Sequence, residues 1–485
     1  MLFTSIKFIV FYIFFLVIYF FLRKTRKFAI LIASYVFCAF WSIRSLLFLV
    51  CITLITYISG IVLEKYNKKI IVYSTICLLV ICLFWLKYSN FTIEIINGIN
   101  SRLGNNHVFD GINVIAPLGI SFYSLQAIGY LIDVHRKDIV AEKNIINYAV
   151  FISFFSIISS GPIERSGNLL KQIREKFTKP TYEEISNALV LILYGFFLKM
   201  VIADRLSILV DNVFSNYYMY YSFELIIGAV AYSIQLYCDF SSYSIIAMGT
   251  AQALGYKIIE NFDTPYFSTS IKEFWRRWHI SLSSWFRDYI YIPLGGSRCS
   301  KFRKYINLMI TFLISGLWHG ANWTFIIWGW LHGIYQIVGD YTTNLRKKVT
   351  KNIQKNCFSF KLGKIIITNI FVDLAWIVFR SDSLAMACKY ITRMLTKIDP
   401  WNLFGNAIYS LGLDRTEINI LIVSLIIVFI VDIVKYTKRL NIAQELHKQN
   451  LWFRWSVIFG LLFMIVIFGE YGAMFDAKSF VYFQF

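Results

Sequence analysis

Two long, uninterrupted apolar blocks constrain the fold of this chain more than any other feature of its sequence. One runs from Phe8 to Leu22, and another, from Ile420 to Val434, is broken only by Ser424 and Asp432. Each approaches the roughly 20 apolar residues that a membrane-spanning helix requires. Only helices and closed barrels satisfy their backbone hydrogen bonds in lipid. The blocks are continuous rather than alternating, so the sequence predicts helices and not a barrel.

The composition agrees with a membrane protein. Hydrophobic residues make up 58% of the 485 residues and charged residues only 16%, whereas a soluble domain carries about 25% charged residues. The net charge of +20 raises the possibility of nucleic acid as a partner. The basic residues lie mainly in short loops between apolar blocks, where they set topology and contact anionic lipid. We therefore expect membrane lipid as a partner and no nucleic acid.

The basic loops predict the topology. They comprise residues 23–27, 65–69, 135–137, 171–179, 298–304, 346–355 and 435–439, all interpreted as cytoplasmic. Segment 28–63 lies between two such loops, which predicts a helical hairpin with its turn near Arg44. The other expected spans are 8–22, 70–86, 148–158, 188–202, 225–237, 309–317, 323–338, 365–379, 418–434 and 457–468. Several of these segments are short, so we expect half-spans or re-entrant segments among them, about eleven full spans in all, and both termini outside the cytoplasm.

The chain is expected to form a single all-α polytopic domain. No internal repeat, low-complexity segment or long linker divides it, and we distinguish N-terminal spans (1–110), a core (111–400) and C-terminal spans with an aromatic tail (401–485). A transporter, with many spans and few buried charges, is the competing class, although transporters often show repeated halves. A scaffold that only recruits a transferase is a third. The eight cysteines have no metal-ligand spacing, so neither disulfides nor a metal site are predicted.

His319 is the first candidate for chemistry. It lies in the sequence Trp-His-Gly-Ala-Asn-Trp directly after the largely apolar run 308–317. A histidine at the end of a half-buried helix can titrate near neutral pH and take a proton from an attacking hydroxyl. The alternative is a structural histidine bonded to a backbone carbonyl. Ionisable groups at membrane depth are enriched in functional sites, which keeps the catalytic interpretation open beside the structural one.

Segment 271–298 reads IKEFWRRWHISLSSWFRDYIYIPLGGSR and predicts one amphipathic helix at the cytoplasmic interface. Its apolar stripe comprises Phe274, Trp275, Trp278, Leu282 and Trp285. One interpretation is a membrane-surface helix with snorkelling arginines. The other is a basic, aromatic mouth in which Arg276 and Arg277 receive the phosphates of an anionic thioester near His279.

Asp239 and Tyr482 complete the candidates. Asp239, in Tyr-Cys-Asp-Phe-Ser-Ser-Tyr, either orients a histidine, as the acid of a catalytic triad does, or pairs with Arg276 or Arg277. The chain ends in Phe-Val-Tyr-Phe-Gln-Phe. This tail is either an interfacial aromatic anchor or an external segment whose Tyr482 phenol takes up the acyl group as a covalent relay.

Five motifs together resemble the membrane-bound O-acyltransferase (MBOAT) family, in its bacterial branch of alginate and peptidoglycan O-acetyltransferases and teichoic-acid D-alanylation proteins. They are PLGISF (117–122), SGPI (160–163), DFS (239–241), FWRRWHISLSSWFRDYIYIPLGG (274–296) and GLWHGANWTFIIWG (316–329). The resemblance extends from about Pro117 to the C-terminus. In the family, the histidine that matches His319 is essential, and His279 matches the second histidine of the bacterial branch. Ile245 stands near a position where the family commonly has an acid.

The resemblance implies a ring of helices, with re-entrant and amphipathic segments, around a central funnel in the bacterial inner membrane. A thioester donor, acetyl-CoA or a similar compound, enters from the cytoplasm, and the acceptor enters from outside. It also implies an extracytoplasmic SGNH-type partner and a short acyl group, in the first place acetyl, with D-alanyl transfer to teichoic acid as the alternative, and no bound cofactor. We expect Asn322 or Trp323 to stabilise the oxyanion of the transfer.

Overall fold

The computed structural model describes residues 1–471, except for residues 2, 23, 105–107, 113–115, 176, 352–356, 404–406 and 440–441. Tyr482 lies outside the described residues. Every regular element in the described part of the chain is a helix, which confirms the predicted all-α fold. The lengths and apolar composition of these helices confirm a multi-pass membrane protein.

Seven helical stretches are long and apolar enough to cross a membrane. They are Ile43–Tyr66, Lys69–Arg102, Tyr182–Ser215, Ser222–Ala253, Phe358–Arg380, Arg415–Lys438 and Leu451–Phe468. The remaining segments in which we expected spans form shorter or less apolar helices. The expected span 148–158, for example, is a helix of nine residues, Ile145–Ser153, followed by turns. Such short helices are consistent with the re-entrant segments that we expected among the spans.

The N-terminal half of the ring consists of six helices. These are α1 (Ile6–Phe21), α2 (Arg26–Ala39), α3 (Ile43–Tyr66), α4 (Lys69–Arg102), α5 (Ile120–Arg136) and α6 (Ile145–Ser153). The predicted hairpin is present, with α2 and α3 joined just before Arg44, where Ser42 caps α3 by accepting a hydrogen bond from the Arg44 backbone amide. The hydroxyl groups of Tyr12 and Tyr19 donate to the carbonyls of Thr250 and Leu254, which tie α1 to the middle of the chain.

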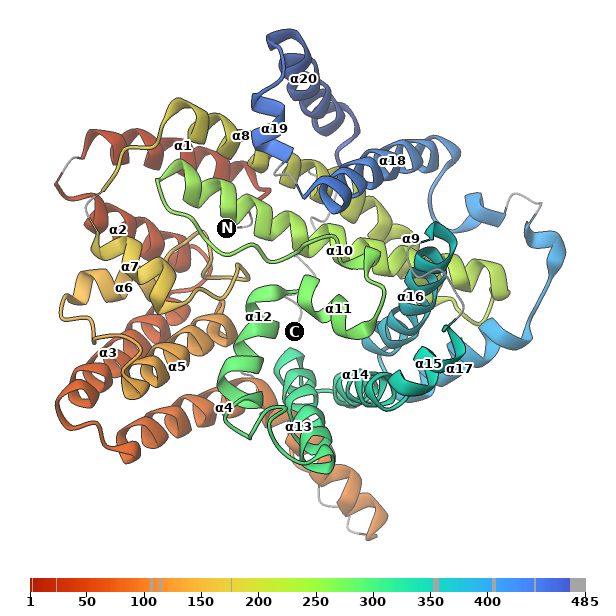
Figure 1. The fold of residues 1–485 in the computed structure, drawn as a ribbon, viewed down its shortest axis with the longest axis horizontal. Coiled ribbons are helices and arrows are strands. Elements are labelled where there is room, and N and C mark those ends of the chain that lie inside the picture. Colours follow the sequence, from red (N-terminus) through yellow and green to blue (C-terminus); the bar gives the residue numbers. More distant parts are fainter. Residues whose placement is uncertain are drawn as a thin grey trace.

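The middle of the chain alternates long and short helices. They are η1 (Ser166–Leu170), α7 (Lys171–Arg174), α8 (Tyr182–Phe196), η2 (Phe197–Ala203), α9 (Asp204–Ser215), α10 (Ser222–Ala253), η3 (Pro265–Phe267), α11 (Ile271–Arg277), α12 (Ile280–Phe286), η4 (Arg287–Tyr291), α13 (Lys301–His319) and α14 (Trp323–Tyr341). A π-helical segment, η2, joins α8 to α9 without interrupting the helix. Figure 1 shows α10 running across the molecule, with the short helices α11 and α12 beside it.

The C-terminal helices close the other side. They are α15 (Thr343–Val349), α16 (Phe358–Arg380), α17 (Leu384–Thr396), η5 (Pro400–Leu403), η6 (Ala407–Ser410), α18 (Arg415–Lys438), α19 (Ile442–His447) and α20 (Leu451–Phe468). In Figure 1, helices α1, α2, α3, α5 and α6 lie on one side of α11 and α12, α14, α16 and α17 lie on the other, and the long helix α4 runs past α13. Only 6% of the most apolar stretch of α20 is buried in the protein. Its apolar side chains therefore face lipid, while the short helices occupy the interior.

Candidate active site

His319 is the last residue of α13, and the turn that follows leads directly into α14. Ser300 caps the start of α13 by accepting a hydrogen bond from the Arg303 amide, and Asn322 caps α14 by accepting one from the Thr324 amide at 3.0 Å. The His319 side chain is buried, with 3% of its surface exposed. The predicted placement of this histidine at the end of a helix is correct.

Glycines allow α13 and α14 to approach at backbone distance. A Cβ atom on Gly316 would lie 2.3 Å from the carbonyl oxygen of Phe325, and one on Gly329 would lie 2.4 Å from that of Phe312. Such distances leave no room for a side chain. The hairpin therefore holds His319, three residues beyond Gly316, in a fixed position against α14.

Aromatic rings surround His319. Its ring centroid lies 5.1 Å from Trp318, 5.0 Å from Trp328 and 5.4 Å from Phe379, all at steep angles. Trp328 and Phe379 come from α14 and α16. Packing of this kind restricts the imidazole to one orientation, which a proton-transfer group needs.

The second predicted histidine, His279, lies at a break between two short helices. Its backbone adopts φ +44°, and its side chain is 1% exposed. Its Nδ1 lies 3.1 Å from the Oδ1 atom of Asn261, which also accepts hydrogen bonds from the amide and hydroxyl of Ser281. Because this oxygen can only accept, Nδ1 carries the proton, and the neutral ring presents the lone pair of Nε2.

Trp318 brings the two histidines together. Its ring lies 5.1 Å from the ring of His319 and 6.2 Å from the ring of His279. Phe122, from α5, packs on the same indole at 5.2 Å. The two histidines, 40 residues apart in the chain, thus flank one aromatic side chain.

The prediction of one amphipathic helix over residues 271–298 is wrong. The segment forms α11, a break at Trp278 and His279, α12 and then the π-helical η4. All five residues of the predicted apolar stripe are buried inside the protein, none more than 9% exposed. The stripe faces other helices rather than lipid, so the segment is part of the core.

The basic residues of this segment lie apart from the histidines' aromatic shell. Arg277 forms ion pairs with Asp263 at 3.3 Å and Glu273 at 3.1 Å, and the Arg276 side chain is exposed. Trp275 is buried and donates its indole N–H to Nδ1 of His332 at 3.2 Å. Arg276 is thus exposed on the surface of α11 and Arg277 is held in ion pairs, whereas Trp275 packs α11 against α14.

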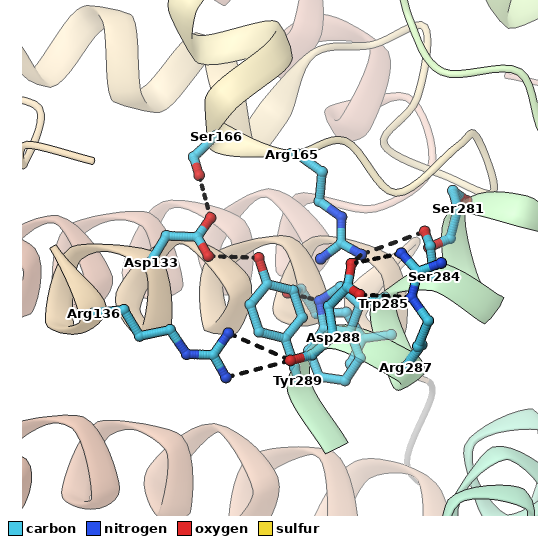
Figure 2. Close-up of polar contacts among 11 residues, drawn as sticks. Asp133, Arg136, Arg165, Ser166, Ser281, Ser284, Trp285, Arg287, Asp288 and Tyr289 are labelled. Atoms are coloured by element: carbon cyan, nitrogen blue, oxygen red, sulfur yellow. Dashed lines mark hydrogen bonds and ion pairs between the residues drawn. The ribbon is translucent and has the colours of Figure 1, made fainter. Parts of the chain in front are cut away.

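A polar network anchors the far end of the His279 segment to α5 (Figure 2). Asp133 accepts hydrogen bonds from the hydroxyls of Tyr289 at 2.7 Å and Ser166 at 2.5 Å. Figure 2 also shows Asp288 between two guanidinium groups, those of Arg165 and Arg287. Both Asp288 and Tyr289 belong to η4, so the network fixes η4 to α5 and η1 and limits the movement of α12.

Asp239 has a partner that the sequence did not indicate. Its carboxylate pairs with the ammonium of Lys199, from η2, at 2.6 Å, and the same ammonium pairs with Asp204 at 2.8 Å. All three side chains are at most 7% exposed. Asp239 therefore forms its ion pair with Lys199 and not with Arg276 or Arg277, as one interpretation expected. This contact does not orient a histidine, which was the other expected role of Asp239.

A large polar cavity, which we term the charged cavity, opens beside the His319 turn. It has a volume of about 480 Å³ and is lined by Gly320, Ala321 and Asn322 from the turn. Its charged lining residues are Lys87, Lys199, Asp204, Asp211, Asp239, Arg380 and Asp382. Arg380 pairs with Asp211 at 2.7 Å. Many carboxylate oxygens and several cations suit a ligand rich in hydroxyl groups.

A second, smaller cavity of about 90 Å³, the small cavity, adjoins His319 itself. It is lined by His319, Trp318, Phe122, Lys87 and Trp41, together with residues 116–121 and Ser159. Lys87 is the residue that lines both cavities. Among the described residues, no three His, Cys, Asp or Glu side chains gather closely enough to hold a metal ion.

Asn322 and Trp323 were expected to act as oxyanion donors. The Asn322 side chain is engaged at both ends, since its oxygen caps α14 and its nitrogen donates to the Asp382 carbonyl at 3.3 Å. Trp323 is 49% exposed and packs on Phe91. Sequence reasoning also passed over Lys87 and Lys199. The signal for both was a lysine within an apolar helix, which is costly unless it is functional or paired.

Comparison with known proteins identifies relatives of the whole site region. The family model described as MBOAT, membrane-bound O-acyltransferase family, matches residues 30–379. A protein named probable alginate O-acetylase AlgI from Pseudomonas syringae pv. tomato is 38% identical over 387 residues, covering 79% of this chain and 72% of its own. The peptidoglycan O-acetyltransferase of Helicobacter pylori is 33% identical over 401 residues, covering 76% and 73%. The teichoic acid D-alanyltransferase of Bacillus subtilis is 30% identical over 285 residues, covering 55% and 69%.

Proposed function

The chain belongs to the membrane-bound O-acyltransferase family, and from this premise we propose that it moves an acetyl group from acetyl-CoA to an exported or cell-surface polysaccharide, with His319 at the reacting centre. It is a multi-pass membrane O-acyltransferase. The relatives that are named as an O-acetylase and an O-acetyltransferase match more of this chain than the D-alanyltransferase does. This favours acetyl as the transferred group.

One observation supports His319 as the general base. Its imidazole is fixed by three aromatic rings, lines the small cavity, and precedes the residues that line the charged cavity. A hydroxyl in the charged cavity can therefore reach the turn that carries the imidazole. In the proposed reaction, His319 takes the proton of that hydroxyl as its oxygen attacks the thioester carbonyl. His279 packs against the same Trp318 side chain, with its ring centroid 6.2 Å from the indole.

The size of the small cavity supports a short acyl group. An engineered cavity of 150 Å³ in another protein holds benzene, which has six heavy atoms. About 90 Å³ is room for an acetyl group with its three heavy atoms and is less than a fatty acyl chain fills. The pantetheine and phosphates of the donor are proposed to lie toward the exposed Arg276 on α11.

The orientation in the membrane is proposed from the basic loops. Residues 298–304, at the start of α13, face the cytoplasm under the positive-inside rule, so the end of α13 with His319 points outward. This orientation places donor entry in the cytoplasm of a bacterial inner membrane and the charged cavity toward the acceptor. Both termini are then extracytoplasmic, where an SGNH-type partner completes transfer to the polymer.

Tyr482 is a proposed first acceptor. The last described residues approach the charged cavity, because Glu470 pairs with Arg205 at 2.8 Å and its amide donates to the Met200 carbonyl. Arg205 directly follows Asp204, which lines that cavity. Tyr482 is twelve residues beyond Glu470, and an extended segment of that length spans up to about 40 Å. The tail is therefore long enough for a relay.

The test is acetyl transfer from radiolabelled acetyl-CoA by the purified protein in proteoliposomes, with label followed into protein and into polysaccharide fragments. His319→Ala is expected to abolish label transfer while the protein still inserts and keeps its thermal midpoint. His332→Gln is the matched control, since His332 is an equally buried histidine that accepts a hydrogen bond from Trp275. Full turnover in His319→Ala would refute the proposal.

Intact-mass analysis tests the relay separately. An acetyl adduct of the wild-type protein that is absent from Tyr482→Phe supports Tyr482 as the intermediate. Normal polysaccharide labelling by Tyr482→Phe assigns the transfer to direct attack by the acceptor.

A further inference from the structure

Lys87 lies in the middle of α4 and reaches the end of the helix that carries His319. Its ammonium donates to the carbonyl oxygens of Trp318 at 2.8 Å and His319 at 3.1 Å. The next residue, Tyr88, donates its hydroxyl to the carbonyl of Leu317. Three consecutive carbonyls at the C-terminus of α13 are thus bonded by two neighbouring side chains of α4.

These two contacts use two of the three N–H donors of the Lys87 ammonium. A lysine ammonium has three N–H donors, and the carbonyls of Trp318 and His319 are its acceptors within the described part of the chain. The side chain lines the charged cavity on one side and the small cavity on the other. Its remaining N–H is therefore available to an oxygen atom of a ligand where the two cavities meet.

We propose that Lys87 is a catalytic residue that donates this hydrogen bond to the oxyanion formed during acyl transfer. The proposal rests on acyl transfer at His319. It assigns to Lys87 the role expected of Asn322 or Trp323, since the Asn322 amide donates to the Asp382 carbonyl and the exposed Trp323 ring packs on Phe91. A full positive charge in a site shielded from water stabilises an oxyanion more than a neutral donor does.

The reaction then proceeds in two balanced steps. The acceptor oxygen bonds to the thioester carbon, its proton passes to the imidazole of His319, and the carbonyl electron pair moves onto the oxygen that Lys87 contacts. In the second step, that electron pair re-forms the carbonyl, the carbon–sulfur bond breaks, and the departing thiolate takes the proton from the imidazolium. Neither step requires an oxidant or another reactant.

Lys87 and Tyr88 provide a matched pair of variants that separate oxyanion stabilisation from helix anchoring. Lys87→Met removes two of the three hydrogen bonds that anchor the end of α13, together with the proposed oxyanion donor, whereas Tyr88→Phe removes the third anchoring bond alone. Removal of one oxyanion donor typically costs about 10²–10³ in kcat. We expect that loss for Lys87→Met, with the KM for acetyl-CoA changed less than about threefold, and a loss below about fivefold for Tyr88→Phe.

Steady-state kinetics in proteoliposomes, with His319→Ala in parallel, decide the outcome. If Lys87→Met and Tyr88→Phe lose activity equally, or if Lys87→Met stays within tenfold of wild type, the proposal is wrong and Lys87 is only an anchor. Should Lys87→Met fail to insert, Lys87→Gln, which keeps amide donors for the two carbonyls without a charge, is judged by the same criteria. Activity in His319→Ala would instead refute the proposed function, irrespective of the Lys87 result.

Discussion

The close crossing of α13 and α14 leads to a quantitative prediction about Gly316. In Gly316→Ala, the new Cβ atom would lie 2.3 Å from the Phe325 carbonyl oxygen, and an ordinary contact begins at 3.4 Å. The obstacle is backbone, so no side chain can turn away, and the two helices must separate by about 1.1 Å. His319 is one helical turn from Gly316 and moves with α13.

A displacement of about 1 Å at a reacting group costs roughly 10²-fold in rate, or about 2.7 kcal/mol of activation free energy. Overpacking also lowers the free energy of unfolding by about 1–3 kcal/mol. We expect Gly316→Ala to insert normally, to unfold at a lower temperature and to lose about 10²-fold in acetyl transfer. The assay is turnover of labelled acetyl-CoA, together with thermal unfolding in detergent.

Gly460→Ala in α20 is the matched control, because a Cβ atom there meets nothing within 4 Å. It introduces the same methyl group into a helix and should leave turnover unchanged. If Gly316→Ala folds and retains turnover within threefold of wild type, the inference that the glycine contact positions His319 is refuted.

Three further predictions concern other parts of the molecule. Lys199→Met removes the cation that pairs with both buried carboxylates, whereas Asp239→Asn leaves the Lys199–Asp204 pair intact. Lys199→Met should therefore lower the thermal midpoint more, by an amount equivalent to about 3–5 kcal/mol, and an equal or opposite order would contradict this. Burial raises the pKa of Glu164, in the loop before η1, to about 7, so its contribution to stability is complete below pH 4.5 and is lost as the pH rises through 7. The thermal midpoint should therefore fall over this range in the wild type and less in Glu164→Gln, and equal slopes would exclude Glu164 as the cause. Finally, propionyl-CoA should be a slow donor and octanoyl-CoA inactive in the same assay, because the cavity beside His319 holds about 90 Å³; rapid octanoyl transfer would show that the acyl group lies elsewhere.

The features of the site that depend on local pattern could be predicted from the sequence. The apolar run before His319 and the small residues after it indicated a helix end, and α13 ends at that residue. The basic loops on both sides of residues 28–63 indicated the α2–α3 hairpin. In both cases neighbouring residues carry the whole signal, so no knowledge of distant contacts is required.

The break at His279 could not be predicted in this way. Helical spacing of Phe274, Trp278 and Trp285 is satisfied equally by one helix and by two helices that share a buried face. What separates α11 from α12 is the loop before α11, since Asn261 bonds to His279, to Ser281 and to the amide of Ile280. Those bonds hold His279 at a positive φ that local propensity disfavours.

The partners of the buried charges were also beyond the sequence. Lys87 bonds to carbonyls 231 and 232 positions away, and Lys199 pairs with Asp239 across 40 positions. Spacing along one helix contains no information about such pairs. A lone lysine in an apolar helix indicates that a partner exists, and only the arrangement of helices identifies it.

The π-helical segment η2 makes the lining of the charged cavity depend on residue count. A π-helical turn accommodates one residue more than an α-helical turn, and each residue of an α-helix advances the side chains by about 100°. Deletion of one residue between Phe197 and Ala203 would let α8 and α9 join as a regular helix in which Asp204, Ser207 and Asp211 still face the cavity that they line. Deletion of one residue from α8, with η2 kept π-helical, would instead rotate these three side chains by that angle and turn them away from the cavity. An alignment gap within η2 therefore preserves the wall that faces the proposed acceptor, whereas a gap within α8 changes it.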